Sequence, residues 1–344
     1  MNNSTIIHKE RIIWIDQLRA VAMLFVVFGH VAIDKEAIKY IYSFHMPLFF
    51  IISGMTHRPN KFNTYIDLIK DKAQKLLLPY LLMNLLMFPV WILNFKIIKV
   101  SSTSLVEVFK GIFYANSNIY TAPSNATWFL IILFLVEVVF YGLERFFQHN
   151  DRMLVLAAGI MGVAAYAESK DKAGYTGPGH IELVMTAIVF YLIGYMFIKN
   201  LDQVKTFMAK RKNYFMTVII LLLVGLYFSD NNARVSFNGN DFGSILYFYI
   251  VAISLSVVCI LLVMKLPYIK LLTYIGQNTI AYVGFHIPMI RFMERSHPIF
   301  KENHLYAIGL AICVYFALIP FIVFINRFLP FIVGKKYRKN RLKA

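Results

Sequence analysis

Long apolar runs recur along this chain from about residue 12 to residue 333, separated by short polar stretches. The hydrocarbon core of a bilayer is about 30 Å thick, and a helix crosses it with roughly 20 mostly apolar residues. Hydrophobic residues make up 59% of the 344 residues and charged residues only 15%, whereas an average soluble domain has about 45–50% and about 25%. The runs therefore exclude a water-soluble domain and predict an all-α, polytopic membrane helix bundle.

We count ten candidate transmembrane helices. They cover approximately residues 12–33, 40–56, 76–95, 127–147, 153–168, 181–198, 213–229, 242–264, 271–290 and 305–328. An even number places both termini on one side of the membrane. Lys and Arg are more numerous in the segments on that side, and because cytoplasmic loops are rich in Lys and Arg, we expect both termini to be cytoplasmic. We interpret residues 1–344 as a single domain, with the bundle at about 12–330 and a basic tail at 331–344.

The regions between the spans account for the charge of the chain. The net charge of +17 follows from basic segments that set topology, so binding of nucleic acid is not implied.

Cys259 and Cys313 lie inside apolar runs, and neither a disulfide framework nor a metal site is expected. Residues 96–126 form the longest exterior loop, which we interpret as a connector, with a lid as the alternative. Residues 67–75 have the spacing of an interfacial helix.

The first span carries three residues that are costly to place in a membrane. An ionisable group at membrane depth costs at least about 2.5–3.5 kcal/mol on insertion scales and is a functional candidate by default. Arg19 and His30 are eleven residues apart, close to three full helical turns, so they share one face. Asp16 precedes Arg19 by three residues, the spacing at which opposite charges pair. This stripe predicts one passage that joins the leaflets; the alternative is an ion pair that sets topology and a His30 that bonds a neighbouring helix.

Two further histidines are expected at the same depth as His30. His45 in Y-S-F-H-M-P-L-F-F-I-I-S-G and His286 in A-Y-V-G-F-H-I-P-M-I are each followed two residues later by proline. A proline inside a helix frees the carbonyl four residues earlier, and such a break is tolerated at membrane depth only where protein or a water-filled cavity covers it. The three histidines therefore predict a polar cavity at the exterior end of these helices, in which an imidazole can take and return a proton near neutral pH.

Five other side chains are weaker candidates, and each has a structural alternative. Glu137 is placed mid-membrane and is expected to hold a cation, orient a histidine or hydrogen-bond a neighbour. Trp128 is either a substrate contact or part of the aromatic belt at the membrane border. Ser53 is either a nucleophile or, with the glycine after it, a site of close helix packing. Lys72 and Lys75 either bind phosphate or anionic lipid, or fix topology.

These motifs resemble those of the integral membrane acyltransferases of family 3, which include fucose 4-O-acetylase-like and other polysaccharide O-acetyltransferases. The resemblance covers residues 11–330. It rests on W-I-D-Q-L-R-A with Arg19 and His30 in the Arg-x10-His spacing, S-F-H-M-P-L-F-F-I-I-S-G, K-D-K-A-Q-K-L-L-L-P-Y, T-W-F-L and Y-I-G-Q-N-T-I-A-Y-V-G-F-H-I-P. Lys75 stands where many relatives carry arginine.

The resemblance implies a multi-pass protein of the cell membrane, in this case the bacterial cytoplasmic membrane. It also implies acyl-CoA as the donor on the cytoplasmic side. The acyl group, commonly acetyl, would pass to a hydroxyl of a cell-surface or lipid-linked carbohydrate. By this analogy His30 is the catalytic histidine and Arg19 its essential partner. Lys72 and Lys75 would attract the phosphates of CoA, and Arg19 would hold the donor or Asp16.

The chemistry expected at the cavity of the three histidines is general base catalysis. A sugar hydroxyl becomes nucleophilic when a base takes its proton as the C–O bond forms. We expect His30 to be that base, with His45 or His286 orienting it or stabilising the developing oxyanion. A covalent acyl-enzyme on His30 or Ser53 is the second mechanism.

Two other function classes stay open. Intramembrane charges and proline-broken helices also mark transport pathways, so a transporter or flippase of a glycan precursor is the alternative, and a membrane scaffold of a glycan-assembly complex is the third. The expected partners are acyl-CoA, a glycan acceptor and membrane lipid. Which sugar, which acyl chain and which oligomeric state apply is left open.

Overall fold

The computed structural model describes residues 12–31, 34–93, 104–116, 119–120, 122–170, 177–296 and 303–335. Within these ranges the chain is almost entirely helical, and its one β-type contact is an isolated bridge between Ser236 and Asp241. The segments before residue 150 are α1 Ile13–Gly29, α2 Lys35–Met55, α3 Tyr65–Lys72, the π-helical turn η1 Ala73–Leu77, α4 Leu78–Ile92, α5 Leu105–Tyr114, the 3-10 turn η3 Asn125–Thr127 and α6 Trp128–Phe146.

The segments after residue 150 are also helical. They are α7 Asp151–Lys170, the 3-10 segment η4 Pro178–Leu183, α8 Val184–Lys199, α9 Leu201–Ala209, α10 Arg211–Asp230, α11 Ile245–Met264, α12 Lys270–Gly276, α13 Thr279–Ser296, α14 His304–Phe328 and the 3-10 turn η6 Pro330–Val333. The expectation of an all-α membrane fold is met, because helices fill the apolar runs.

Seven helical segments in the described part of the chain are long and apolar enough to cross a bilayer. They are Tyr65–Ile92, Asn125–Phe146, Asp151–Ser169, Pro178–Lys199, Arg211–Asp230, Ile245–Met264 and His304–Phe328. The other three regions that we expected to span correspond to α1, α2 and the pair α12–α13. These three regions carry many of the buried polar side chains, among them Asp16, His45, Asn278 and His286. Of these helices, α1 has 17 residues and α12 only 7, so both are shorter than the seven segments, the shortest of which has 19 residues.

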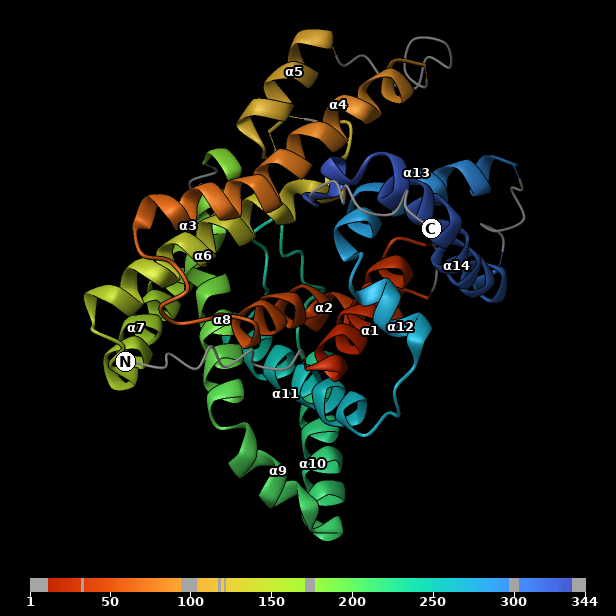
Figure 1. Cartoon of the computed structure of the whole chain (residues 1–344). Coiled ribbons are helices and arrows are strands. Elements are labelled where there is room, and N and C mark those ends of the chain that lie inside the picture. Colours follow the sequence, from red (N-terminus) through yellow and green to blue (C-terminus); the bar gives the residue numbers. More distant parts are fainter. Residues whose placement is uncertain are drawn as a thin grey trace, which may run out of the picture.

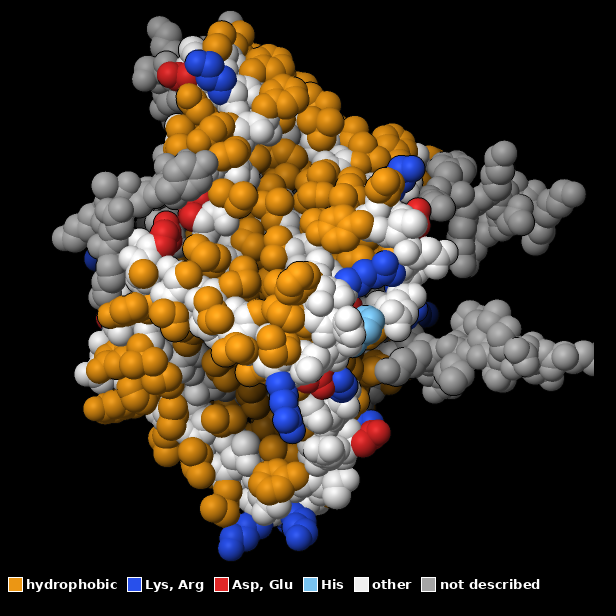
Figure 2. All heavy atoms as spheres, turned by 90° about the vertical axis from the view of Figure 1, so that its left-hand side faces the viewer, with side chains coloured by type: hydrophobic (Ala, Val, Ile, Leu, Met, Phe, Trp, Pro, Cys, Tyr) orange, Lys and Arg blue, Asp and Glu red, His pale blue; other side chains and the backbone are white. Residues whose placement is uncertain are grey.

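The helices surround α1 and α2. Figure 1 shows α1 and α2 together in the middle, with α6, α7 and α8 on one side, α12, α13 and α14 on the other, and α10 and α11 below them. Contacts of α2 with α8 and α11, and of α1 with α12, α13 and α14, tie the surrounding helices to this pair. Figure 2 shows broad tracts of apolar side chains on the outer face, with Lys and Arg gathered mainly on its right-hand side and at its lower tip.

The region predicted as one span at residues 271–290 is two helices. Gln277 and Asn278 form the turn between α12 and α13. Gly276, the last residue of α12, packs against α1, where a Cβ atom would lie only 1.7 Å from the backbone oxygen of Asp16. The expectation of a continuous helix was wrong: the chain turns at Gln277 and Asn278, and the turn brings both amides to the wall of an internal cavity.

Two other expectations about segments also need correction. The interfacial helix expected at 67–75 and the span expected at 76–95 form one helical run over residues 65–92, joined by the π-helical turn η1. The exterior loop expected at 96–126 contains α5, which begins with a capping box in which Ser104 and Glu107 each bond the other's backbone N–H. Residues 96–103, 117–118 and 121 of that loop, and residues 94–95 of the expected span, lie outside the described residues.

Two glycines let α2 and α8 cross in close contact. A Cβ atom on Gly54 would lie 1.9 Å from the backbone oxygen of Tyr191, and one on Gly194 would lie 1.8 Å from the backbone oxygen of Ile51. Small residues at a membrane helix interface allow such backbone approach. The interpretation of residues 53–54 as a close packing site is therefore correct for Gly54.

We expect Gly54→Ala to destabilise the fold strongly, because even a methyl group overlaps the backbone of α8. Overpacking of this kind costs about 1–3 kcal/mol and occasionally more. The matched control is Gly309→Ala on α14, where a Cβ atom meets nothing within 4 Å. The measurement is the thermal midpoint of detergent-purified protein by fluorescence-detected size exclusion. Equal midpoints for the two variants would contradict the close crossing.

Candidate functional site

A cavity of about 130 Å³ at the C-terminal end of α1 is lined by all three histidines singled out from the sequence, and we call it the histidine cavity. The ring centroids of His30 and His286 are 5.0 Å apart. His45 and His286 are buried, at 5% and 0% exposure, whereas His30 is exposed. A group that enters from the protein surface can therefore reach His30 more readily than the other two.

Two of these histidines are oriented by their own helices. The Nδ1 atoms of His45 and His286 lie 2.7 Å from the carbonyl oxygens of Ile41 and Tyr282. Because a carbonyl only accepts, each Nδ1 donates, and in a neutral ring Nε2 then carries the lone pair. The Nε2 atom of His286 is buried and has no hydrogen-bond partner among the described residues. An unsatisfied buried polar atom of this kind requires an explanation. The contact between the rings of His286 and His30 suggests that His286 acts together with His30.

Aromatic and amide side chains complete the histidine cavity. Trp128 lines it and stacks on Phe237, with centroids 6.3 Å apart and planes inclined by 18°. Asn125 and Asn238 supply amide groups on the same wall. Trp128 thus faces a cavity inside the protein. This position favours a substrate contact over a residue of the lipid-facing aromatic belt.

A buried hydrogen-bond network fixes the turn that carries Trp128. The amide of Asn84 donates to the Thr127 hydroxyl at 3.0 Å and accepts from the Ser124 N–H at 3.0 Å. The Ser124 hydroxyl donates to the carbonyl of Gly284 at 3.2 Å. Gly284 lies four residues before Pro288, so this is a carbonyl that the proline was expected to free, and protein rather than water satisfies it.

A second cavity, of about 260 Å³, is lined by Arg19 and lies toward the opposite end of α1. We call it the arginine cavity. Arg19 is bound to Asp16, with 3.1 Å between Nη1 and Oδ1, and it donates to the Thr56 hydroxyl at 3.2 Å. Gln277 donates to the second oxygen of Asp16 at 3.4 Å. The i, i+3 pair expected within the first span therefore forms.

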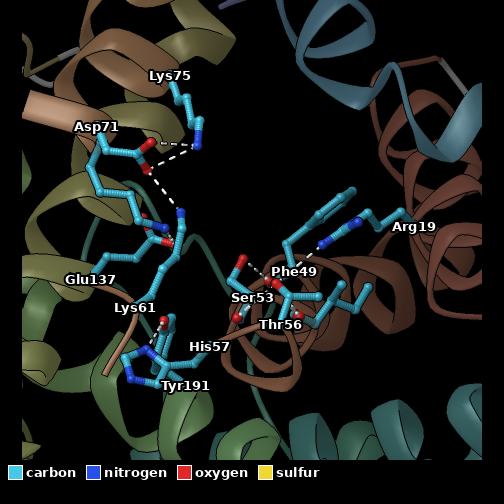
Figure 3. Close-up of polar contacts among 12 residues, drawn as sticks. Arg19, Phe49, Ser53, Thr56, His57, Lys61, Asp71, Lys75, Glu137 and Tyr191 are labelled. Carbon is cyan, nitrogen blue, oxygen red and sulfur yellow. Dashed lines mark hydrogen bonds and ion pairs between the residues drawn. The ribbon is translucent and has the colours of Figure 1, made fainter. Parts of the chain in front are cut away.

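The two lysines expected at a phosphate site are engaged in ion pairs. Lys72 lies 2.8 Å from the carboxylate of Glu137, and Lys75 lies 2.7 Å from that of Asp71. Asp71 also pairs with Lys61 at 3.2 Å. Figure 3 shows the Lys61–Asp71–Lys75 group and Arg19 on opposite sides of Ser53 and Thr56. Of the three roles considered for Glu137, the geometry supports holding a cation, the ammonium of Lys72.

A smaller cavity of about 120 Å³ adjoins the arginine cavity, and Thr56 and Glu137 line both. It adds Arg58 and Lys61, which the sequence analysis did not single out. Burial lowers the pKa of the Lys61 ammonium, and the nearby Lys75 ammonium lowers it further against the attraction of Asp71.

Other site residues were missed as well. Gln277 and Asn278 stand inside a quoted motif, Y-I-G-Q-N-T, which is a signal that would have found them. Lys335 lines the arginine cavity and was assigned only to the basic tail. His57 binds the Glu144 carboxylate at 2.9 Å and the Tyr191 hydroxyl at 3.0 Å; its partners are far apart in the sequence, so no local pattern identifies it.

The geometry does not support Ser53 as a nucleophile. Its hydroxyl donates to the carbonyl of Phe49 at 2.8 Å, one turn earlier in α2. It lines the arginine cavity, while the three histidines line the other one. In the described part of the chain no group of three or more His, Cys, Asp and Glu side chains is arranged to hold a metal ion.

The histidine and arginine cavities are neighbours divided by an apolar partition. Phe49, Phe129 and Val283 line both cavities, and each of the three is buried. The eleven-residue separation of Arg19 and His30 corresponds to roughly 16 Å along α1 at 1.5 Å per residue. The passage expected from the polar stripe is therefore two cavities that meet at this partition.

Comparison with known families gives one finding. Residues 12–329 match the model of an acyltransferase domain, Acyl_transf_3. The match includes every residue that lines the histidine cavity, and every residue of the arginine cavity except Val333 and Lys335. No curated protein and no solved structure matches the chain.

Proposed function

The chain belongs to the acyltransferase 3 family of membrane acyltransferases, and on this premise we propose that it is an O-acyltransferase that moves an acyl group, acetyl in the simplest case, from acyl-CoA to a carbohydrate hydroxyl. The observation that carries the proposal is the pair of cavities on either side of the apolar partition. In the proposed orientation ten spans cross the membrane of a bacterial cell, both termini are cytoplasmic, and the histidine cavity faces outward.

The arginine cavity and its smaller neighbour suit the donor because positive charge exceeds negative charge around them. CoA carries several phosphate oxygens, which Arg and Lys bind through charge-assisted hydrogen bonds. Among the described residues, the carboxylates near the two cavities are those of Asp16, Asp71, Glu137 and Glu144, and the cations are those of Arg19, Arg58, Lys61, Lys72, Lys75 and Lys335. Lys72 and Lys75 are then held in place by their carboxylate partners, and the surplus cations attract phosphate.

The histidine cavity suits deprotonation of the acceptor. In the proposed step a sugar hydroxyl gives its proton to His30 as its oxygen attacks the thioester carbon. The new C–O bond forms, the C–S bond breaks, and the proton on His30 leaves with the CoA thiolate as the free thiol. His286 packs against the ring of His30 and orients it, while His45 lies on the same cavity wall.

The partition suits the site of transfer. A thioester that enters from the arginine cavity meets Phe49, Phe129 and Val283, and a hydroxyl that enters from the other side meets the same three residues. Apolar walls exclude water, which would otherwise hydrolyse the activated acyl group. Direct transfer across the partition is favoured over a seryl intermediate, because the Ser53 hydroxyl is bonded to the Phe49 carbonyl.

We expect purified protein in detergent to release free CoA thiol from acetyl-CoA only when a glycan acceptor is present, because the base acts on an acceptor hydroxyl. The measurement is thiol release with a panel of oligosaccharides, followed by mass spectrometry of the glycan to identify the added group. Labelled acyl-protein in the absence of acceptor would indicate a covalent relay instead. No thiol release with any acceptor, together with glycan uptake into liposomes, would overturn the proposal in favour of a transporter.

A further inference from the structure

A further cavity of about 130 Å³ adjoins the histidine cavity, and we call it the outer cavity. It lies between α13 and the segment that leads into η3, and Asn125, Ala126, Val283 and Ile287 line both cavities. Arg291 lines only the outer one. A ligand whose reacting hydroxyl sits beside His30 therefore extends past Asn125 toward Arg291.

Arg291 brings a positive charge to this cavity. Its side chain is exposed, on the helix that also carries His286. No Asp or Glu lines the outer cavity or the histidine cavity. Within the described ranges no carboxylate lies within ion-pair distance of Arg291, whereas Arg19, Lys61, Lys72 and Lys75 all have carboxylate partners. A guanidinium without such a partner binds a carboxylate or phosphate in two parallel hydrogen bonds.

The rest of the lining suits the sugar that bears the charge. Asn125 is exposed and stands between the two cavities, where its amide can donate to one hydroxyl and accept from another. Trp91 lines the outer cavity and Trp128 lines the histidine cavity. Indole rings offer apolar surface to the C–H faces of a sugar, with a polar N–H at the edge.

We propose that the outer cavity is a subsite for an acidic group of the acceptor, a carboxylate or a phosphate on the glycan next to the residue that is acylated. This inference rests on the proposed function and adds to it the chemical class of the acceptor, an anionic carbohydrate. Arg291 acts there as a binding residue that selects the charged acceptor.

The first test is a binding measurement that needs no acyl transfer. Two of the three tryptophans, Trp91 and Trp128, line the cavities in question, so intrinsic fluorescence reports occupancy. Purified protein is titrated with methyl glucuronide and with methyl glucoside, which differ by the carboxylate. We expect the glucuronide to bind at least tenfold more tightly, and Arg291→Gln to remove that preference while leaving the glucoside unchanged. Arg295→Gln, one turn further along α13, is the matched control.

The outcomes separate this inference from the proposed function. Equal binding of the two glycosides by the unaltered protein, or a glucuronide preference that survives in Arg291→Gln, would overturn the subsite. Acceptor-dependent thiol release that does not prefer acidic glycans would leave the function standing and the subsite refuted. Arg291-dependent glucuronide binding without any thiol release would do the reverse.

A last arm distinguishes the acceptor from a lipid headgroup as the source of the anion. The titration is repeated in nanodiscs of phosphatidylcholine and in nanodiscs that contain phosphatidylglycerol. An unchanged glucuronide preference in both supports an acceptor subsite. Loss of the preference in phosphatidylglycerol would show that lipid phosphate occupies Arg291 and would overturn the proposal.

Discussion

His30→Ala is expected to lower the rate of acyl transfer by about 10²–10⁴-fold, the contribution typical of a positioned general base. His30 is the exposed member of the three histidines that line the cavity, and its ring meets that of His286. The protein is expected to remain folded, because an exposed side chain at the C-terminal end of α1 leaves no cavity in the core when it is truncated. The measurement is acceptor-dependent thiol release, normalised to monodisperse protein.

The matched control is His304→Ala, which removes another exposed histidine, at the start of α14. It is absent from the walls of the four cavities described here, so we expect unaltered transfer. His286→Ala tests the positioning role, with a smaller loss than His30→Ala because the base itself remains. Full activity in folded His30→Ala protein would show that the base is another group.

The second large effect is expected at Arg19. Arg19→Gln removes the ion pair that Arg19 makes with Asp16, a carboxylate that is only 2% exposed. Loss of a hydrogen bond to a charged group costs about 1.5–3 kcal/mol, so both the thermal midpoint and the affinity for acyl-CoA are expected to fall. A lost hydrogen bond between Arg19 and a phosphate of acyl-CoA costs a similar free energy, so we expect the KM for acyl-CoA to rise by about 10–100-fold.

A double variant separates stability from donor binding. In Asp16→Asn with Arg19→Gln both charges are gone, so the thermal midpoint is expected to recover while the KM for acyl-CoA stays high. Asp202→Asn with Lys205→Gln removes an exposed ion pair of the same i, i+3 spacing on α9, and neither quantity should change. If the double variant at positions 16 and 19 regained the original KM, Arg19 would have a purely structural role.

Local spacing predicted a large part of the site. Residues on one helix have fixed angular positions, so the shared face of Arg19 and His30 and the pairing of Asp16 with Arg19 follow from the helical repeat. The prolines after His45 and His286 indicated where polar surroundings are required, and the structure brings both histidines to the cavity of His30. These inferences needed only the geometry of single helices.

Contacts between distant segments were beyond the reach of such spacing. Lys72 and Glu137 are 65 residues apart, yet they form an ion pair, so neither side chain was expected to neutralise the other. The turn at Gln277 and Asn278 lies in an apolar stretch that has the length of a span, and only the structure shows that α12 ends and α13 begins there. Lys335 and Arg58 reach cavities through the packing of their segments.

The sequence by itself determined that this chain is a helical membrane protein, and it identified the three histidines and the Asp16–Arg19 pair. These properties depend on composition and on the helical period, which are local. Only the tertiary structure decided that Phe49, Phe129 and Val283 divide the interior into two cavities and that Arg291 opens into a third beside them. Such cavities depend on how helices far apart in the chain pack together, and that packing is set by many weak contacts that no short stretch of sequence contains.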